Sequence, residues 1–152
     1  LKELKAAGIH TIIETSGYGR QDDLLSLAEY TDTFYYDFKL GDKELFRKYT
    51  GGDLKIVLDN LAALRMATEH IVLRVPLIPR ITDTLENVCM AYDTAVRMQI
   101  GEVHLLPYNQ NAGAKYEWCG REYGLGERMQ EKELFERLLE AAPAELTVWV
   151  VK

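Results

Sequence analysis

Cysteine, proline and long hydrophobic runs are scarce in this chain of 152 residues. Its two cysteines, Cys89 and Cys119, lie 30 positions apart, so they form neither a CxxC metal motif nor a disulfide framework. We expect two free thiols in a reducing cytoplasm. No apolar run reaches the roughly 18 residues that a membrane span needs, and no signal-peptide pattern opens the chain. These absences predict a cytoplasmic protein that has no membrane partner and no metal ligands.

The chain also lacks an excess of basic residues and a glycine-rich phosphate loop. Lysine and arginine total 18 against 24 acidic residues, a net charge of −6 with both signs interspersed, which argues against a nucleic-acid partner. Neither a GxGxxG nor a Walker sequence follows any predicted strand, which disfavours a nucleotide-binding sheet. Gly51-Gly52 is an isolated pair at a predicted helix junction, where a helix cap is the simpler interpretation.

The residues that are present indicate one folded domain over 1–152. The chain is 47% hydrophobic and 28% charged, and its length allows a sizeable core. It opens with "LKELKAAGI", a pattern typical of the last turns of a helix that Gly8 ends. Because a domain rarely begins inside a helix without a start signal, the sequence predicts a fragment of a longer protein.

Strand and helix patterns alternate along the chain. β-branched and apolar runs predict strands at 9–15, 33–40, 70–79, 101–108 and 144–152. Amphipathic patterns predict helices at 21–30, 42–52, 53–68, 83–98 and 129–143. Pro76 is expected to end regular pairing near Val75, and Asp83 with Glu86 has the spacing of a capping box.

The strands are hydrophobic almost throughout, without the alternation of a half-exposed sheet. That pattern is typical of a parallel sheet whose strands are joined by right-handed helical crossovers, which makes the fold class α/β. Two architectures fit these observations: an open doubly wound sheet, or a (β/α) barrel or part of one.

Polar side chains come at the carboxyl ends of four successive strands. Glu14 ends the first strand, Asp37 and Lys39 lie in the second, Arg74 precedes the proline of the third, and Asn109 follows the fourth. The steps from Lys39 to Arg74 and from Arg74 to Asn109 are both 35 residues, one βα repeat each. Because ligands of parallel α/β folds bind where strands end, we expect these groups to converge. Two carboxylates, two cations and an amide suit a small zwitterion.

A long segment from Asn109 to about Arg128 interrupts the pattern before the last helix. It is rich in polar, aromatic and glycine residues, and segments of this length inside a domain tend to be functional. Its aromatic residues Tyr116, Trp118 and Tyr123 either recognise a protein partner or pack the segment onto the domain, and the sequence leaves both readings open.

Seven motifs in order resemble the glycyl-radical-enzyme activating enzymes of the radical S-adenosylmethionine (SAM) superfamily. They are "LKAAGIHTIIETSGY", "YYDFKL", "FRKYTGG", "VLDNLAAL", "LRVPLIPRITDT", "VHLLPYN" and "KYEWCGREY". The resemblance implies an incomplete (β/α) barrel of the partial TIM-barrel type. It also implies SAM and a [4Fe-4S] cluster as cofactors, a glycyl radical enzyme such as pyruvate formate-lyase as protein substrate, and an electron donor such as flavodoxin or ferredoxin.

The resemblance also implies which residues face SAM. Asp37 and Lys39 match the family's D-x-K strand, Glu14 lies where the family often has Asp, and Arg74 matches the arginine before the proline. Asn109 stands where many members have His, and an amide cannot titrate near neutral pH. The predicted cofactor-binding residues are therefore Glu14, Asp37, Phe38, Lys39, Arg74 and Asn109; no catalytic residue is predicted within this chain.

Two family motifs are absent. Neither the cluster-binding C-x3-C-x2-C nor the G-G-E-P stretch occurs, so the chain by itself is expected to bind no cluster and to cleave no SAM. We interpret it as the carboxyl-terminal part of an activating enzyme. Two alternatives remain: a cluster-free barrel fragment that only binds or scaffolds a partner, and an aldolase or isomerase that uses Lys39 as a Schiff-base amine, which Asp37 would disfavour by stabilising the charged ammonium.

Overall fold

The computed structural model describes residues 1–109, 116, 118–120, 122 and 130–151. Five strands form one sheet in the order β1-β2-β3-β4-β5, and each strand runs parallel to its neighbours. The strands are β1 (Ile12–Thr15), β2 (Thr33–Asp37), β3 (Ile71–Pro76), β4 (Glu102–Leu106) and β5 (Thr147–Val150). The strand order therefore follows the chain, and all carboxyl ends lie along one edge of the sheet.

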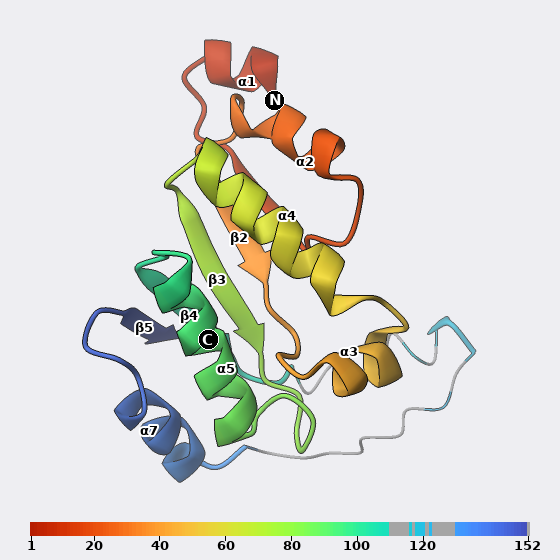
Figure 1. The fold of residues 1–152 in the computed structure, drawn as a ribbon, viewed down its shortest axis with the longest axis vertical. Helices are drawn as coiled ribbons and strands as arrows, with labels where there is room; N and C mark the ends of the chain where they lie inside the picture. Colours follow the sequence, from red (N-terminus) through yellow and green to blue (C-terminus); the bar gives the residue numbers. More distant parts are fainter. Residues whose placement is uncertain (110–115, 117, 121, 123–129, 152) are drawn as a thin grey trace.

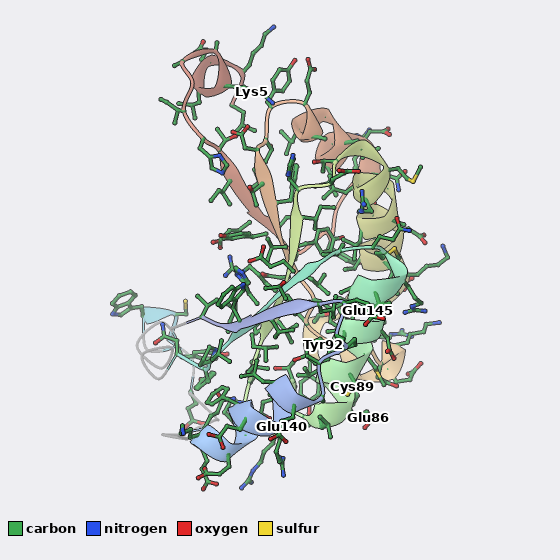
Figure 2. The ribbon with its side chains drawn as sticks, turned by 90° about the vertical axis from the view of Figure 1, so that its left-hand side faces the viewer. Lys5, Glu86, Cys89, Tyr92, Glu140 and Glu145 are labelled. Carbon is green, nitrogen blue, oxygen red and sulfur yellow. The ribbon has the colours of Figure 1, made fainter. Side chains whose placement is uncertain are left out.

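Helices connect the strands and lie mainly on one side of the sheet (Figure 1). They are α1 (Lys2–Ala6), α2 (Gln21–Ala28), α3 (Lys43–Thr50), α4 (Leu54–Ala67), α5 (Leu85–Arg97) and α7 (Lys132–Glu140). Figure 2 shows α2, α4 and α5 on the same side of the sheet. A doubly wound sheet reverses its strand order and carries helices on both faces, whereas a barrel wall does neither. The structure thus selects the barrel-type alternative: the described elements form an arc of a (β/α) barrel.

The helix-covered face of the sheet forms the core. Phe34, Tyr36, Leu73, Val103 and Leu105 are all fully buried there. Because side chains alternate along a strand, these five residues point toward α4 and α5 from three neighbouring strands. Burial of large apolar side chains on this scale is the main stabilisation of the domain.

Hydrogen bonds hold the helices at this face. The buried Tyr36 hydroxyl donates to the Val57 carbonyl of α4 at 2.6 Å. On α5, Tyr92 donates to the Leu138 carbonyl of α7 at 2.9 Å, and Figure 2 shows Tyr92 between those two helices. Each hydroxyl therefore fixes one helix against its neighbour in the fold.

All five strands are shorter than the sequence pattern predicts, and the structure shows why for the first two. The first strand begins at Ile12 and not at residue 9, because the Ile9 amide donates to the Leu4 carbonyl and closes the end of α1, with Gly8 in the left-handed region at φ 71°. The second strand ends at Asp37 and not at Leu40. The Phe38 amide still donates to the Arg74 carbonyl of β3, but the Lys39 carbonyl and the Gly41 amide are bonded by the Asn87 side chain of α5.

The third strand ends at Pro76, beside the predicted limit near Val75. Pro76 itself lies opposite Leu106, and the next residue, Leu77, donates its amide to the Leu106 carbonyl at 2.8 Å. A second local prediction was wrong. The N-cap of α5 is Thr84 rather than Asp83, and its side chain accepts from the Asn87 amide. The Asp83 carboxylate instead accepts from the Arg80 amide at 2.7 Å, where Arg80 has φ 63°.

No helix within the described ranges has the length and hydrophobicity of a membrane span.

Candidate ligand site at the carboxyl edge of the sheet

Three of the predicted residues meet around the Arg74 guanidinium. Arg74 lies opposite Asp37 in the register of β2 and β3, which sets the two side chains on the same face of the sheet. Its Nη1 lies 2.6 Å from Glu14 Oε1, and its Nε lies 3.7 Å from Asp37 Oδ1. The site therefore draws one group from each of β1, β2 and β3, as the polar strand ends predicted.

The Asp37 carboxyl is poorly satisfied in this arrangement. Burial raises the pKa of Asp37 above its usual value, and Glu14 adds to the rise, while Arg74 and Lys39 oppose it. Asp37 Oδ1 and Arg74 Nε are both buried without a hydrogen-bond partner, since 3.7 Å is too long for a hydrogen bond. A buried polar atom left unsatisfied costs about 1–3 kcal/mol. Two such atoms that face each other indicate a place where a polar ligand can bind.

Aromatic side chains that sequence reasoning missed hold Arg74 in place. The guanidinium lies 5.1 Å from the centre of the Tyr35 ring, and that ring makes an edge-on contact with His104 at 5.7 Å. His104 Nε2 in turn lies 2.8 Å from Glu102 Oε1. Tyr35 precedes Asp37 by two residues, so strand alternation alone could have placed it beside the site.

Lys39 acts on this cluster through its charge, which opposes the rise that burial causes in the pKa of Asp37. Within the described residues, the ion pair of Asp37 is with Arg74 and not with Lys39. Lys39 follows the end of β2 by two residues and lines a cavity of about 240 Å³. The other residues lining that cavity are Ser16, Tyr18, Phe46, Thr50, Gly51 and Gly52.

The remaining predicted residues have different surroundings. The Phe38 side chain is 2% exposed and belongs to the core, so only its backbone faces the edge, where its amide donates to the Arg74 carbonyl at 2.7 Å. Asn109 is exposed and lies three residues beyond β4. The predicted roles of both residues in cofactor binding stay predictions.

The aromatic residues of the long segment are only partly described. Tyr116 is 42% exposed and Trp118 is 83% exposed, while Tyr123 lies outside the described residues. The choice between partner recognition and packing onto the domain stays open for this segment.

The described side chains include no group of three or more His, Cys, Asp and Glu residues arranged to hold a metal ion. The groups present at this edge are ionic and hydrogen-bonding. One guanidinium, one amine and two carboxylates can bind a molecule that carries both an anionic and a cationic group.

Two solved structures share this fold. It superimposes on a domain of pyruvate formate-lyase-activating enzyme from Bacteroides vulgatus with a TM-score of 0.78 at 15% identity, which covers 99% of this chain and 86% of that one. A radical SAM methyltransferase from Sphaerobacter thermophilus gives a TM-score of 0.64 at 15% identity, over 95% of this chain and 42% of that one. These similarities establish the partial-barrel fold.

Sequence comparison then gives the family. The chain is 33% identical over 127 residues to pyruvate formate-lyase 2-activating enzyme of Escherichia coli, which covers 84% of this chain and 44% of that protein. It is 34% identical over 145 residues to trans-4-hydroxy-L-proline dehydratase activating enzyme of Clostridioides difficile, over 91% of this chain and 48% of that protein. No protein-family profile matches. The chain belongs to the glycyl-radical-enzyme activating enzymes, and it spans a little under half the length of these relatives.

Proposed function

We propose that this chain is the SAM-facing part of an enzyme that generates a glycyl radical on a partner enzyme. The observation that carries the proposal is the cluster of Glu14, Asp37 and Arg74 on three adjacent strands, with two buried polar atoms left unsatisfied. The relatives in the activating-enzyme family support the same reading, as their names state that they activate other enzymes.

The residues at this edge fit SAM. SAM is a zwitterion whose methionyl end has a carboxylate and an ammonium group beside a sulfonium centre. Arg74 would bind the carboxylate through its guanidinium, while Asp37 and Glu14 would bind the cationic groups. Lys39, lining the neighbouring cavity, would bind a further oxygen of the ligand. The unsatisfied Oδ1 of Asp37 and Nε of Arg74 would then gain partners.

The residues of this chain do not fit a [4Fe-4S] cluster. Such a cluster is held by three or four thiolates, and the chain has two cysteines, of which Cys89 is partly buried on α5 and Cys119 is exposed. We therefore assign no cluster ligand here. In the family, SAM together with a reduced cluster supplies the radical that takes a hydrogen atom from a glycine of the partner.

The role of this chain's own residues is to bind SAM and to orient it. Arg74 is 16% exposed and lies against Tyr35, so its guanidinium is already restricted before a ligand arrives. A restricted side chain loses less entropy on binding, which raises affinity. Asp37 is 28% exposed, and its partial burial strengthens any ionic bond that it makes with a cationic ligand.

The partner in this proposal is a glycyl radical enzyme, and the electrons come from flavodoxin or ferredoxin. The relatives named above activate different enzymes, a pyruvate formate-lyase and a hydroxyproline dehydratase. The proposal therefore fixes the class of partner and leaves the individual partner to experiment. Location in the cytoplasm is part of the same proposal.

Titration calorimetry with SAM tests the proposal on the chain as it stands. We expect saturable binding by the wild type, weakened at least about tenfold in Arg74→Ala, which corresponds to about 1.4 kcal/mol. S-adenosylhomocysteine, which lacks the sulfonium charge but keeps the ammonium group, should bind less tightly than SAM because the carboxylates then lose one of their two cationic partners. Arg97→Ala, an exposed arginine of α5, is the matched control and should bind as the wild type does.

Equal SAM affinity in wild type and Arg74→Ala would contradict the placement of SAM at this edge. A second experiment tests the cluster assignment: after reconstitution with iron and sulfide, the chain should stay colourless. Stoichiometric iron with visible charge-transfer absorption would show that the thiols of this chain do bind a cluster.

A further inference from the structure

Buried amide side chains bond the loops that follow the strands. Asn87 of α5 is 5% exposed, and it uses all of its side-chain hydrogen-bonding groups except one lone pair of its oxygen. Its Nδ2 donates to the Lys39 carbonyl and to the Thr82 carbonyl, each at 3.1 Å. Its Oδ1 accepts from the Gly41 amide at 3.0 Å. One side chain thus joins the loop after β2 to the loop after β3.

Gln130 makes the same kind of connection one strand further along. Its Oε1 accepts from the Tyr108 amide at 2.8 Å, in the segment after β4. Its Nε2 donates to the Leu77 carbonyl at 3.1 Å and to Asp83 Oδ2 at 2.9 Å, both in the loop after β3. Gln130 therefore joins the loops after β3 and β4.

Asn60 of α4 holds the first loop. It is 3% exposed, and its Nδ2 donates to the Gly17 carbonyl at 2.7 Å and to the Gly19 carbonyl at 3.0 Å. Gly17 has φ 66°, and a Cβ at that position would overlap the Tyr36 hydroxyl, so the loop after β1 has little room to move. All four loops at the carboxyl edge are thus bonded by an amide side chain.

Strand pairing cannot supply these bonds. The Lys39 and Thr82 carbonyls and the Gly41 amide lie beyond the last residues that pair with a neighbouring strand, yet buried backbone groups need a partner. An amide side chain donates two hydrogen bonds and accepts at least one, so it can bond backbone groups of two loops at once. Arginine and lysine only donate, and a carboxylate only accepts. This double capacity accounts for Asn87 and Gln130, which each bond two loops, whereas Asn60 only donates, to two carbonyls of one loop.

We propose that Asn87 and Gln130 are positioning residues, which lock the loops after β2 and β3 and the backbone at Tyr108 into one rigid edge and so fix Lys39 relative to Arg74. Lys39 is the most direct case, because Asn87 bonds its own carbonyl. This inference rests on the proposed function in one respect only: the bound ligand is taken to be SAM. The rigidity of the edge is a property of the ligand-free chain and can be measured without it.

Hydrogen exchange of single backbone amides, followed by NMR on the ligand-free chain, tests the rigidity. Asn87→Ala should speed exchange of the Gly41 amide by about tenfold or more, since that amide loses its acceptor. Gln130→Ala, at a partly buried position where folding is less at risk, should do the same for the Tyr108 amide. SAM affinity should fall by about tenfold in Asn87→Ala although Asn87 is not placed on the ligand.

The matched control is Thr94→Val. Thr94 lies on the same helix as Asn87 and is 2% exposed, but its hydroxyl donates to the Met90 carbonyl of its own helix. This variant should lower stability without raising Gly41 or Tyr108 exchange beyond what the stability change explains. It should bind SAM as the wild type does.

The inference is overturned if Asn87→Ala and Gln130→Ala leave exchange at these two amides at the level of Thr94→Val. It is also overturned if exchange rises while SAM affinity stays at the wild-type value. If the wild-type chain binds no SAM, the proposed function is contradicted instead. The exchange rates then still decide whether the Asn87 and Gln130 side chains hold the loops.

Discussion

The two faces of the sheet differ in how completely their side chains are enclosed by the rest of the chain. On the helix-covered face, side chains such as Leu73 and Leu105 are fully enclosed and their contacts are complete. On the opposite face, Arg74 and His104 lie in the same row of the register, half-buried and polar, and Trp149 is 55% exposed beside them. The first face stabilises the fold, and the second retains groups that can bind a ligand.

This contrast occurs between adjacent residues of a single strand. Leu73 and Arg74 follow one another on β3 and point to opposite faces. The strand backbone is rigid because Leu73 packs into the core, and the same rigidity fixes the base of the Arg74 side chain. The site thus derives its geometry from the core behind it, and the comparison can be tested with paired substitutions.

The largest effect is expected for Leu73→Ala. This substitution removes a fully buried side chain from the central strand and should lower the free energy of unfolding by about 2–5 kcal/mol. Trp149→Ala on the open face is the matched control. It should change the unfolding free energy much less in urea denaturation, and equal losses for the two variants would remove the distinction between the faces.

The next effect separates two neighbouring tyrosines. Tyr36→Phe deletes the buried hydroxyl bonded to the Val57 carbonyl and should cost about 1 kcal/mol in urea denaturation. Tyr35→Phe on the open face keeps the ring that contacts Arg74 and His104, so its stability should stay close to that of the wild type. A larger loss for Tyr35→Phe would mean that the open face contributes more to stability than we infer.

Asp37→Asn should show how much the buried carboxylate of the candidate site lowers the stability of the ligand-free chain. Because burial raises the pKa of Asp37 in the folded chain, the folded state binds this proton more tightly than the unfolded state does. The contribution of Asp37 to stability therefore falls as pH rises from the ordinary Asp value of 3.8 through the raised value.

Asp37→Asn removes this dependence, so the variant should melt above the wild type at pH 7 and lose that advantage below pH 3.8, while its SAM affinity falls. Thermal unfolding followed by circular dichroism across this pH range provides the measurement. A variant less stable than the wild type at pH 7 would show that the ion pair with Arg74 outweighs the burial of the carboxylate.

The smallest effect is expected for Glu14→Gln. The Glu14 side chain is 64% exposed, so its ion pair with Arg74 is screened by solvent and should contribute less than about 1 kcal/mol to stability. The difference from wild type in thermal unfolding should shrink further at 1 M salt. A loss comparable to that of Tyr36→Phe would place Glu14 among the structural residues rather than the ligand-binding ones.

Sequence patterns predicted every strand and the helices α1 to α5 and α7, because burial leaves a pattern in the sequence. Nearly continuous apolar runs mark β2 and β3, and the Asp53 side chain caps α4 at the first residue of the helix predicted for 53–68. Strand ends were predicted less well. At the end of β3, the Leu77 amide bonds a carbonyl of the neighbouring strand β4. After β2, the Lys39 carbonyl is bonded by Asn87, a residue of α5. The sequence around each strand end reveals neither hydrogen bond.

The meeting of Glu14, Asp37 and Arg74 could be predicted from the chain because parallel strands carry their carboxyl ends to one edge. The contacts between them could not, because β2 ends before Lys39 and the strand register sets Arg74 opposite Asp37. The role of the six predicted residues in cofactor binding stays a prediction.

The amino acid sequence by itself determined the α/β class, the order of the elements and the polar groups that follow each strand, because hydrophobic periodicity and helix caps act over a few residues. Tertiary structure decided between an arc of a barrel and a doubly wound sheet, chose Arg74 as the partner of Asp37, and placed Asn87 between two loops. These outcomes depend on strand register and on hydrogen bonds between residues up to 48 positions apart, and no short-range pattern encodes them.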